Sequence, residues 1–209
     1  MKTLTAEQQA KITPHLAIQL LKDGNKRFVE NTKINRNLME QVNQTSEGQY
    51  PFATILSCID SRVSAELVFD QGIGDIFSIR IAGNIVNKDI LGSMEFASKV
   101  AGTKAIVVLG HTNCGAVKGA CDGVELGNLT HLLDKITPAM DLIGDPKEKS
   151  LRNSKNIDFV DAVANANVDR TVDMIRKNSP ILAEMEQSGL IKLVSGMYDI
   201  QTGVVTFHE

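Results

Sequence analysis

Two short apolar segments that end abruptly in chemically reactive side chains constrain the fold of this 209-residue chain more than any other feature. The first is residues 53–57, and Cys58, Asp60 and Arg62 follow it directly. A bounded apolar run of this length that contains β-branched residues is typical of a buried strand. Such strands belong to parallel sheets that are covered on both faces. Polar side chains that follow the strand then lie at its carboxyl end, where open α/β sheets build their sites.

The second segment, residues 104–109, has the same organisation and leads into His111 and Cys114. If the two predicted strands are parallel neighbours, their carboxyl ends meet at one edge of the sheet. We therefore expect Cys58, His111 and Cys114 to converge on one point.

Strand-like and helix-like segments alternate along the rest of the chain, which favours a mostly parallel sheet. We predict an α/β fold with four parallel strands, a C-terminal antiparallel strand added as a hairpin, and flanking helices. No linker, repeat or low-complexity tract is visible, so we expect a single domain over residues 1–209, with an N-terminal helical arm (1–48) and a core (49–209). Residues 32–50 are polar and read as an irregular connection. The remaining predicted strands are 76–81, 190–198 and 204–207, and the main predicted helices are 14–31, 63–69, 91–100, 126–143 and 157–177.

Composition excludes several classes of function. The formal net charge of −3 gives no support for nucleic-acid binding. The N-terminus lacks the apolar core of a signal peptide, and no run of about 18 apolar residues predicts a membrane span. We therefore expect a cytoplasmic protein with no membrane or nucleic-acid partner. Its three cysteines are then better interpreted as metal ligands, catalytic groups or buried apolar residues than as disulfides.

The pattern His111-x-x-Cys114 is weak evidence for a metal site by itself, and Cys58 at the end of a second strand strengthens it. Two thiolates and an imidazole suit zinc better than magnesium or calcium. Three protein ligands leave a fourth position open, which is typical of catalytic zinc, and zinc there would supply hydroxide near neutral pH. Cys121 is a conceivable further ligand, but a buried free thiol is the favoured interpretation.

Asp60 has two functional interpretations and one structural one. It could be the fourth metal ligand and close the site, or it could accept a hydrogen bond from zinc-bound hydroxide. Arg62, two residues further on, could hold the carboxylate with two hydrogen bonds and draw it away from the metal. The structural alternative is a salt bridge at the end of a strand with no role in catalysis.

At these residues the chain closely resembles the β-class carbonic anhydrases. The resemblance covers residues 16 to 125, with a looser match of helix and strand order to the C-terminus. Its motifs are Cys58-x-Asp60-Ser-Arg62, His111-x-x-Cys114-Gly115, Gly24-Asn25-x-Arg27-Phe28 and the segment 74–84 around the second strand.

The resemblance implies one Zn²⁺ per chain on Cys58, His111 and Cys114, with Asp60 and Arg62 as a catalytic pair beside it. It implies reversible hydration of CO₂ to bicarbonate and a proton. It also implies a homo-oligomer, either a dimer or a dimer of dimers, with the leading helices draped over the partner.

The resemblance further implies three substrate-binding residues. Gln49 occupies the place of a glutamine whose amide donates a hydrogen bond to substrate, and Phe77 maps onto an aromatic wall of the pocket. Gly115, next to the second zinc cysteine, is the third. Two positions depart from the family pattern. Ile55 replaces a tryptophan that helps some members to hold inhibitory bicarbonate, so that form of regulation does not carry over, and Phe96 replaces a tyrosine of many members.

Two other functions fit the same residues. Relatives with this zinc site hydrolyse carbonyl sulfide or carbon disulfide, and only the pocket and its access would differ. A non-enzymatic zinc-binding or bicarbonate-sensing protein is the second alternative, but an intact Asp60–Arg62 pair and an open ligand position argue against it. A dithiol redox protein is disfavoured because the chain has no Cys-x-x-Cys motif.

Overall fold

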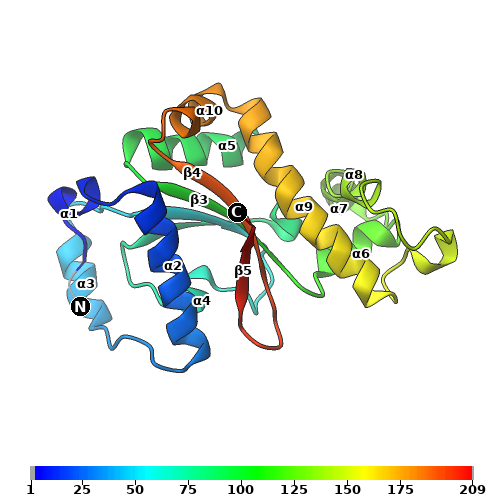
Figure 1. Ribbon diagram of the computed structural model, residues 1–209, viewed down its shortest axis with the longest axis horizontal. Helices are drawn as coiled ribbons and strands as arrows, with labels where there is room; N and C mark the ends of the chain where they lie inside the picture. Colours follow the sequence, from blue (N-terminus) through cyan, green and yellow to red (C-terminus); the bar gives the residue numbers. More distant parts are fainter. Residues whose placement is uncertain (1–2, 209) are drawn as a thin grey trace.

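A five-stranded sheet in the order β2-β1-β3-β4-β5 runs through the centre of the computed structural model (Figure 1). The first four strands are parallel and β5 pairs with β4 in the antiparallel sense, which confirms the predicted sheet. The structure describes residues 3–208, so residues 1, 2 and 209, at the ends of the predicted domain, lie outside it. The strands are β1 (Ala53–Ser57), β2 (Ile76–Arg80), β3 (Ala105–His111), β4 (Lys192–Tyr198) and β5 (Val205–His208).

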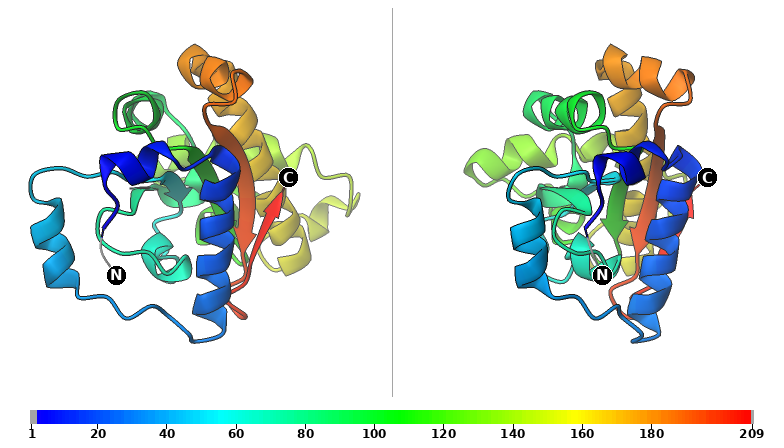
Figure 2. Two further views of the ribbon diagram at one scale, coloured as in Figure 1. Left: turned by 60° about the vertical axis from the view of Figure 1, so that its left-hand side comes forward. Right: turned by 90° about the vertical axis from the view of Figure 1, so that its left-hand side faces the viewer.

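Helices cover both faces of the sheet. Helices α2 (Pro14–Val29) and α4 (Ala65–Val68) pack on one face, and α9 (Ile157–Asn178) crosses the other (Figures 1 and 2). The α9 face also carries α5 (Lys88–Glu95), α6 (Gly115–Cys121), α7 (Gly127–Leu133), α8 (Thr137–Met140) and α10 (Pro180–Gln187). The remaining helices are α1 (Ala6–Ala10) and α3 (Leu38–Thr45), and a π-helical segment, Phe96–Val100, continues α5.

The alternation of side chains along β1 decides on which face the site lies. Ile55 packs into the core cluster beneath α2, whereas Leu56 packs into the cluster beneath α9. Successive residues of a strand point to opposite faces. Cys58, two residues after Leu56, accordingly belongs to the cluster beneath α9, as does Cys114.

The leading helix α2 packs on the sheet of its own chain. Thr13 caps its first turn by accepting a hydrogen bond from the Leu16 backbone N–H, and a proline stands at the first helical position. Its buried residues Ala17, Ile18 and Leu21 join the core cluster that includes Ile55. The predicted boundary between arm and core at residues 48 and 49 stays a prediction.

Two predicted segments differ from the structure. Residues 32–50 contain helix α3, capped by the Asn37 side chain, where an irregular connection is predicted. The helix was missed because it buries only Gln41 and leaves Leu38 and Met39 exposed, so no apolar stripe marks it. The predicted helix 126–143, which Pro138 is expected to kink or break, is split into α7 and α8, with the proline in the first turn of α8.

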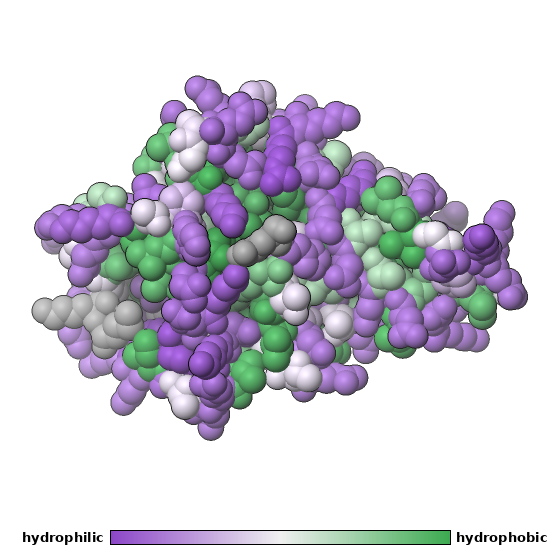
Figure 3. All heavy atoms as spheres, in the orientation of Figure 1, coloured by the Kyte–Doolittle hydropathy of each residue, from purple (hydrophilic) through white to green (hydrophobic). Residues whose placement is uncertain are grey.

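Hydrophilic side chains dominate the face of the molecule seen in Figure 3, with hydrophobic side chains scattered between them. Among the described residues, no helix combines the length and apolar character needed to cross a bilayer.

Candidate metal centre

Cys58, His111 and Cys114 meet at the carboxyl ends of two neighbouring parallel strands. Cys58 follows β1, His111 is the last residue of β3, and Cys114 is the residue that precedes α6. The two strands pair directly, with Ser57 opposite Leu109. The ligand atoms of the three side chains all lie within 4.8 Å of one another, and all three residues are buried. The convergence predicted from the two strand ends is therefore present.

The chemistry and spacing of these atoms fit a zinc ion. The two Sγ atoms are 4.0 Å apart, close to the separation of about 3.8 Å that tetrahedral zinc with ordinary Zn–S bonds requires. The His111 Nδ1 atom donates to the Thr112 carbonyl oxygen at 2.9 Å, which leaves the lone pair of the imidazole on Nε2. Nε2 is buried without a hydrogen-bond partner, a costly arrangement that a metal ion would relieve.

The two buried thiols, Cys58 and Cys114, have pKa values shifted in opposite directions. A hydrogen bond from Cys114 lowers the pKa of Cys58, outweighing the effect of burial, and the Gly83 backbone N–H contributes at 3.4 Å from Sγ. The same interaction, together with burial, raises the pKa of Cys114. One sulfur is therefore a thiolate at neutral pH, the form that binds metal.

Asp60 and Arg62 form a two-pronged ion pair beside these ligands. Arg62 donates from Nε to Oδ1 at 2.9 Å and from Nη2 to Oδ2 at 2.7 Å, and its backbone N–H also donates to Oδ1. These hydrogen bonds hold the pKa of Asp60 well below its usual range, so the carboxylate stays ionised. Its Oδ2 atom lies 3.8 Å from His111 Nε2, so the charge is directly next to the candidate metal position.

Arg80 and Gly83 also support the site, although no role for either residue is predicted from the sequence. Arg80, the last residue of β2, donates to the backbone carbonyls of Cys58 at 3.1 Å and of Asp60 at 2.6 Å. Gly83 has φ of 67°, a conformation that favours glycine. The position of both at the carboxyl end of the second predicted strand was the signal that could have identified them.

A cavity of about 240 Å³ opens next to Cys58 and Asp60. Its wall includes Gly115, the predicted substrate residue, and is otherwise largely apolar, formed by Ile59, Ala82, Ala116, Gly119, Leu129 and Leu133. A small nonpolar molecule could therefore be held beside the Asp60 carboxylate.

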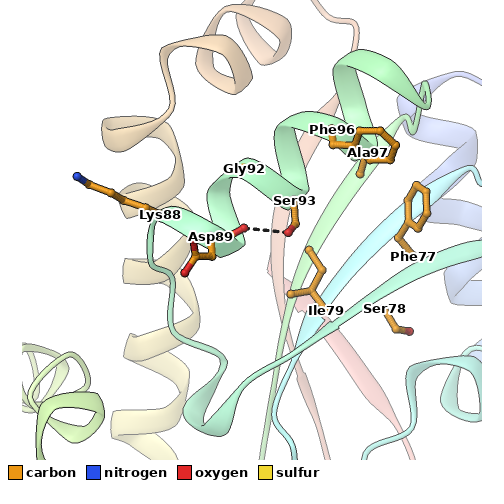
Figure 4. Close-up of a pocket in the computed structure, with 9 residues that line it drawn as sticks. All are labelled: Phe77, Ser78, Ile79, Lys88, Asp89, Gly92, Ser93, Phe96 and Ala97. Carbon is orange, nitrogen blue, oxygen red and sulfur yellow. Dashed lines mark hydrogen bonds between the residues drawn. The ribbon is translucent and has the colours of Figure 1, made fainter. Parts of the chain in front are cut away.

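Gln49 and Phe77 do not reach this cavity within one chain. Phe77 pairs with Thr54 of β1, four residues before Cys58, a distance of about 13 Å along a strand. Its ring instead faces Phe96 across an open cavity between β2 and α5, with ring centroids 6.4 Å apart (Figure 4). Gln49 is exposed in the loop before β1, at the opposite end of that strand from Cys58.

The other residues singled out in the sequence lie apart from the metal ligands. Cys121 is a buried free thiol at the end of α6 and is not in the ligand group. Burial raises its pKa to about 11, so it stays protonated. Ile55, at the position of the family's tryptophan, is fully buried within β1.

Comparisons with known proteins find relatives of this chain in both sequence and structure. A sequence model of the carbonic anhydrase family matches residues 53–205. A carbonic anhydrase of Mycolicibacterium smegmatis is 33% identical over 198 residues, which cover 92% of each protein. A carbon disulfide hydrolase of Saccharolobus solfataricus is 30% identical over 165 residues, or 70% of this chain and 79% of that one. A tetrameric β-carbonic anhydrase from the filamentous ascomycete Sordaria macrospora is similar in structure, with a TM-score of 0.66, 25% identity, and coverage of 80% of this chain and 88% of that one.

Proposed function

Because this chain belongs to the β-carbonic anhydrase family, we propose that it catalyses the reversible hydration of CO₂ to bicarbonate and a proton. In this proposal one zinc ion per chain is held by Cys58, His111 and Cys114. The observation that carries it is the meeting of three buried ligand atoms within 4.8 Å, one of them an imidazole nitrogen with no hydrogen-bond partner.

The bound zinc ion would supply Lewis acidity that makes a water molecule nucleophilic near neutral pH. The Asp60 Oδ2 atom, the carboxylate oxygen nearer to His111, would accept a hydrogen bond from such a water. Arg62 keeps the Asp60 carboxylate ionised and fixes its orientation, because a two-pronged pair leaves the carboxylate little freedom to rotate. This role follows the second of the two functional interpretations of Asp60, in which it orients the nucleophile and does not close the site.

The apolar cavity beside Cys58 is suited to CO₂, a small molecule without charge. Ala82, Ala116 and Leu133 offer it no hydrogen bond, and Gly115 is exposed at the start of α6 with room around its Cα atom. We propose that these residues receive CO₂ next to Asp60. Bicarbonate, which is charged and strongly hydrated, would leave such an apolar wall readily.

Gln49 and Phe77 enter the proposal through a second copy of the chain. In their own chain, both residues lie far from Cys58. For Phe77 the separation is about 13 Å along β1 and β2. If they bind substrate as the family resemblance implies, they serve the metal site of a partner. The tetrameric β-carbonic anhydrase of similar structure supports a homo-oligomer. The proposed assembly is a dimer or a dimer of dimers.

A stopped-flow assay of CO₂ hydration with a pH indicator, from pH 6.5 to 9, tests the function. The zinc content of the protein is measured in parallel. Fast hydration with about one zinc per chain is the expected result. Protein that carries full zinc and shows no hydration at any pH would contradict the proposal.

Hydrolysis of carbon disulfide or carbonyl sulfide is the second candidate, favoured by the 30% identity to the carbon disulfide hydrolase. The same assay with these substrates separates the two functions, and we expect CO₂ to be the preferred one. A cytoplasmic location is also part of the proposal. It is supported by three free thiols, two of which must stay reduced to bind metal.

A further inference from the structure

Helix α9 makes two side-chain hydrogen bonds to backbone groups around the candidate metal ligands. Cys58 lies in the loop after β1, His111 is the last residue of β3, and Cys114 follows in the turn before α6. Asp161 binds the turn between His111 and Cys114, and it is not in the ligand group. Asn167 binds Gly83, in the loop after β2, which contacts Cys58.

Asn167 acts on the Cys58 side through Gly83. Its Nδ2 atom donates to the Gly83 carbonyl oxygen at 2.9 Å, and the Gly83 N–H in turn lies 3.4 Å from Cys58 Sγ. Gly83 adopts φ of 67°, a backbone conformation that residues other than glycine rarely adopt. Asn167 thus fixes the residue whose N–H is aimed at the thiolate.

Asp161 acts on the other ligand turn. Its Oδ1 atom accepts a hydrogen bond from the Asn113 backbone N–H at 2.6 Å. Asn113 lies between His111 and Cys114 and has φ of 57°, in the left-handed region that asparagine tolerates better than most residues other than glycine. The hydrogen bond to Asp161 holds the turn in this conformation, which sets the spacing between the imidazole and the second thiol.

The burial of Asn167 argues that it does more than stabilise the fold. The residue is 1% exposed, and its Oδ1 atom has no hydrogen-bond partner. A buried amide with half of its polar groups unpaired costs stability compared with an apolar side chain of similar shape. The bond to Gly83 is therefore the feature that accounts for an asparagine at this position.

We propose that Asp161 and Asn167 are positioning residues of the metal site, which hold the turn between His111 and Cys114 and the Gly83 loop beside Cys58 from one rigid helix and set how tightly the metal is retained. The inference rests on the proposed function, because it concerns the same site. Groups that orient metal ligands from outside the ligand set commonly change metal affinity by about 10- to 100-fold when they are removed. Both residues lie within one 22-residue helix, so they would hold the two loops in a fixed relation to each other.

The test uses two substitutions that conserve side-chain size, each with a matched control on α9. Asn167→Asp turns the donor that faces Gly83 into a carboxylate oxygen, and Asp161→Asn removes the charge that binds the Asn113 N–H. The control for the first is Asn178→Asp, whose side chain bonds only within the helix, to the Met174 carbonyl. The control for the second is Asp169→Asn, whose partners are Ser195 on β4 and His208 on β5, away from the metal ligands.

Transfer of zinc from the loaded full-length proteins to a chelator is the first readout. We expect Asn167→Asp and Asp161→Asn to release zinc about 10 to 100 times faster than the wild type, while both controls release it at the wild-type rate. The second readout is the sulfur-to-cobalt charge-transfer absorption of the Co²⁺-substituted proteins. A shift of this band in Asn167→Asp reports a changed thiolate environment, which a general loss of stability would not produce.

Wild-type zinc release and an unchanged cobalt spectrum in both variants would overturn the proposal. If Asn167→Asp does not fold, Asn167→Ser, which keeps a hydrogen-bond donor on a smaller side chain, takes its place, and Asp161→Asn tests the other loop independently. Failure of the proposed function gives a different result. In that case the wild-type protein itself would either carry full zinc and show no CO₂ hydration, or take up neither zinc nor cobalt and show no charge-transfer band.

Discussion

Arg62 binds both carboxylate oxygens of Asp60, with Nε 2.9 Å from Oδ1 and Nη2 2.7 Å from Oδ2. The two residues are separated by a single serine, so one short turn after β1 provides both the charge and its orientation. Because Oδ2 lies 3.8 Å from His111 Nε2, a carboxylate fixed in this way faces the position that a metal-activated water would occupy. The geometry favours a role in orienting a nucleophile over that of a remote salt bridge.

Asp60→Asn should keep its zinc and lose most of its CO₂ hydration activity, by about 100-fold or more. The amide presents the same shape but cannot accept hydrogen bonds on both sides or carry the charge. Zinc content and stopped-flow hydration are measured on the same sample. Asp23→Asn, an exposed change on α2, is the control and should hydrate CO₂ as fast as the wild type. Wild-type turnover in Asp60→Asn would return the residue to a purely structural salt bridge.

Replacement of Cys58 should remove the bound zinc, whereas replacement of Cys121 should not. Cys58→Ala should lose zinc and activity together, because two ligands hold zinc far more weakly than three. Cys121→Ala removes a buried thiol whose pKa is raised to about 11 and which lies outside the ligand group, so zinc should stay at one per chain. Elemental analysis after dialysis against a chelator measures the difference. Zinc loss from Cys121→Ala, or full retention in Cys58→Ala, would require a different ligand set.

Mixing a Phe77→Ala chain with a Cys58→Ala chain should restore part of the CO₂ hydration activity that each variant lacks alone. Phe77→Ala is expected to lower the hydration rate, and Cys58→Ala to abolish it. In a mixed dimer, the metal site of the Phe77→Ala chain receives the intact Phe77 of the partner. Random pairing at equal amounts would therefore restore about a quarter of the wild-type sites. The activity of co-expressed chains is compared with that of each variant alone. No gain on mixing would mean that Phe77 does not serve a second copy.

The main features of the site could be predicted because they depend on local rules. Cys58 and His111 each follow a recognisable apolar strand, and parallel strands bring their carboxyl ends together. The proposed roles of Asp161 and Asn167 could not be predicted from the sequence. Both residues lie on a helix that comes well after the ligands in the chain, and they resemble ordinary polar positions of an amphipathic helix. Only the packing of α9 over the sheet brings Asp161 to the backbone of Asn113 and Asn167 to the backbone of Gly83.

The same limit applies to Gln49 and Phe77. The resemblance to the family predicts that they bind substrate, but the distance of Phe77 from Cys58 becomes visible only through the register of β1 and β2. Helix α3 was missed for a different reason, since its stability depends on capping by Asn37 and not on a buried apolar stripe.

A buried ion-pair network ties the segment between α2 and α3 to the core, and it makes a prediction about stability. The Asp70 side chain is 3% exposed and accepts hydrogen bonds from Arg27 Nε at 2.6 Å and Arg36 Nη1 at 2.5 Å. The backbone N–H of Ile34 donates to the same carboxylate. Burial by itself would raise the pKa of Asp70, but these hydrogen bonds outweigh it and lower the pKa below the usual value. The network is therefore stabilising only while Asp70 is ionised.

Arg36→Met should lower the free energy of unfolding at pH 7 by about 3 kcal/mol, because it leaves the buried Asp70 charge with one partner fewer. Since the pKa of Asp70 is lower in the folded state, its contribution is complete above the unfolded-state value of about 3.9 and is lost as the pH falls further. The difference between wild type and variant should thus shrink when urea unfolding is repeated at progressively lower pH. Lys26→Met, which removes an exposed partner of Glu30, is the control and should change stability by less than about 0.5 kcal/mol. An Arg36→Met effect that is small at pH 7, or that grows as the pH falls, would contradict this account of the network.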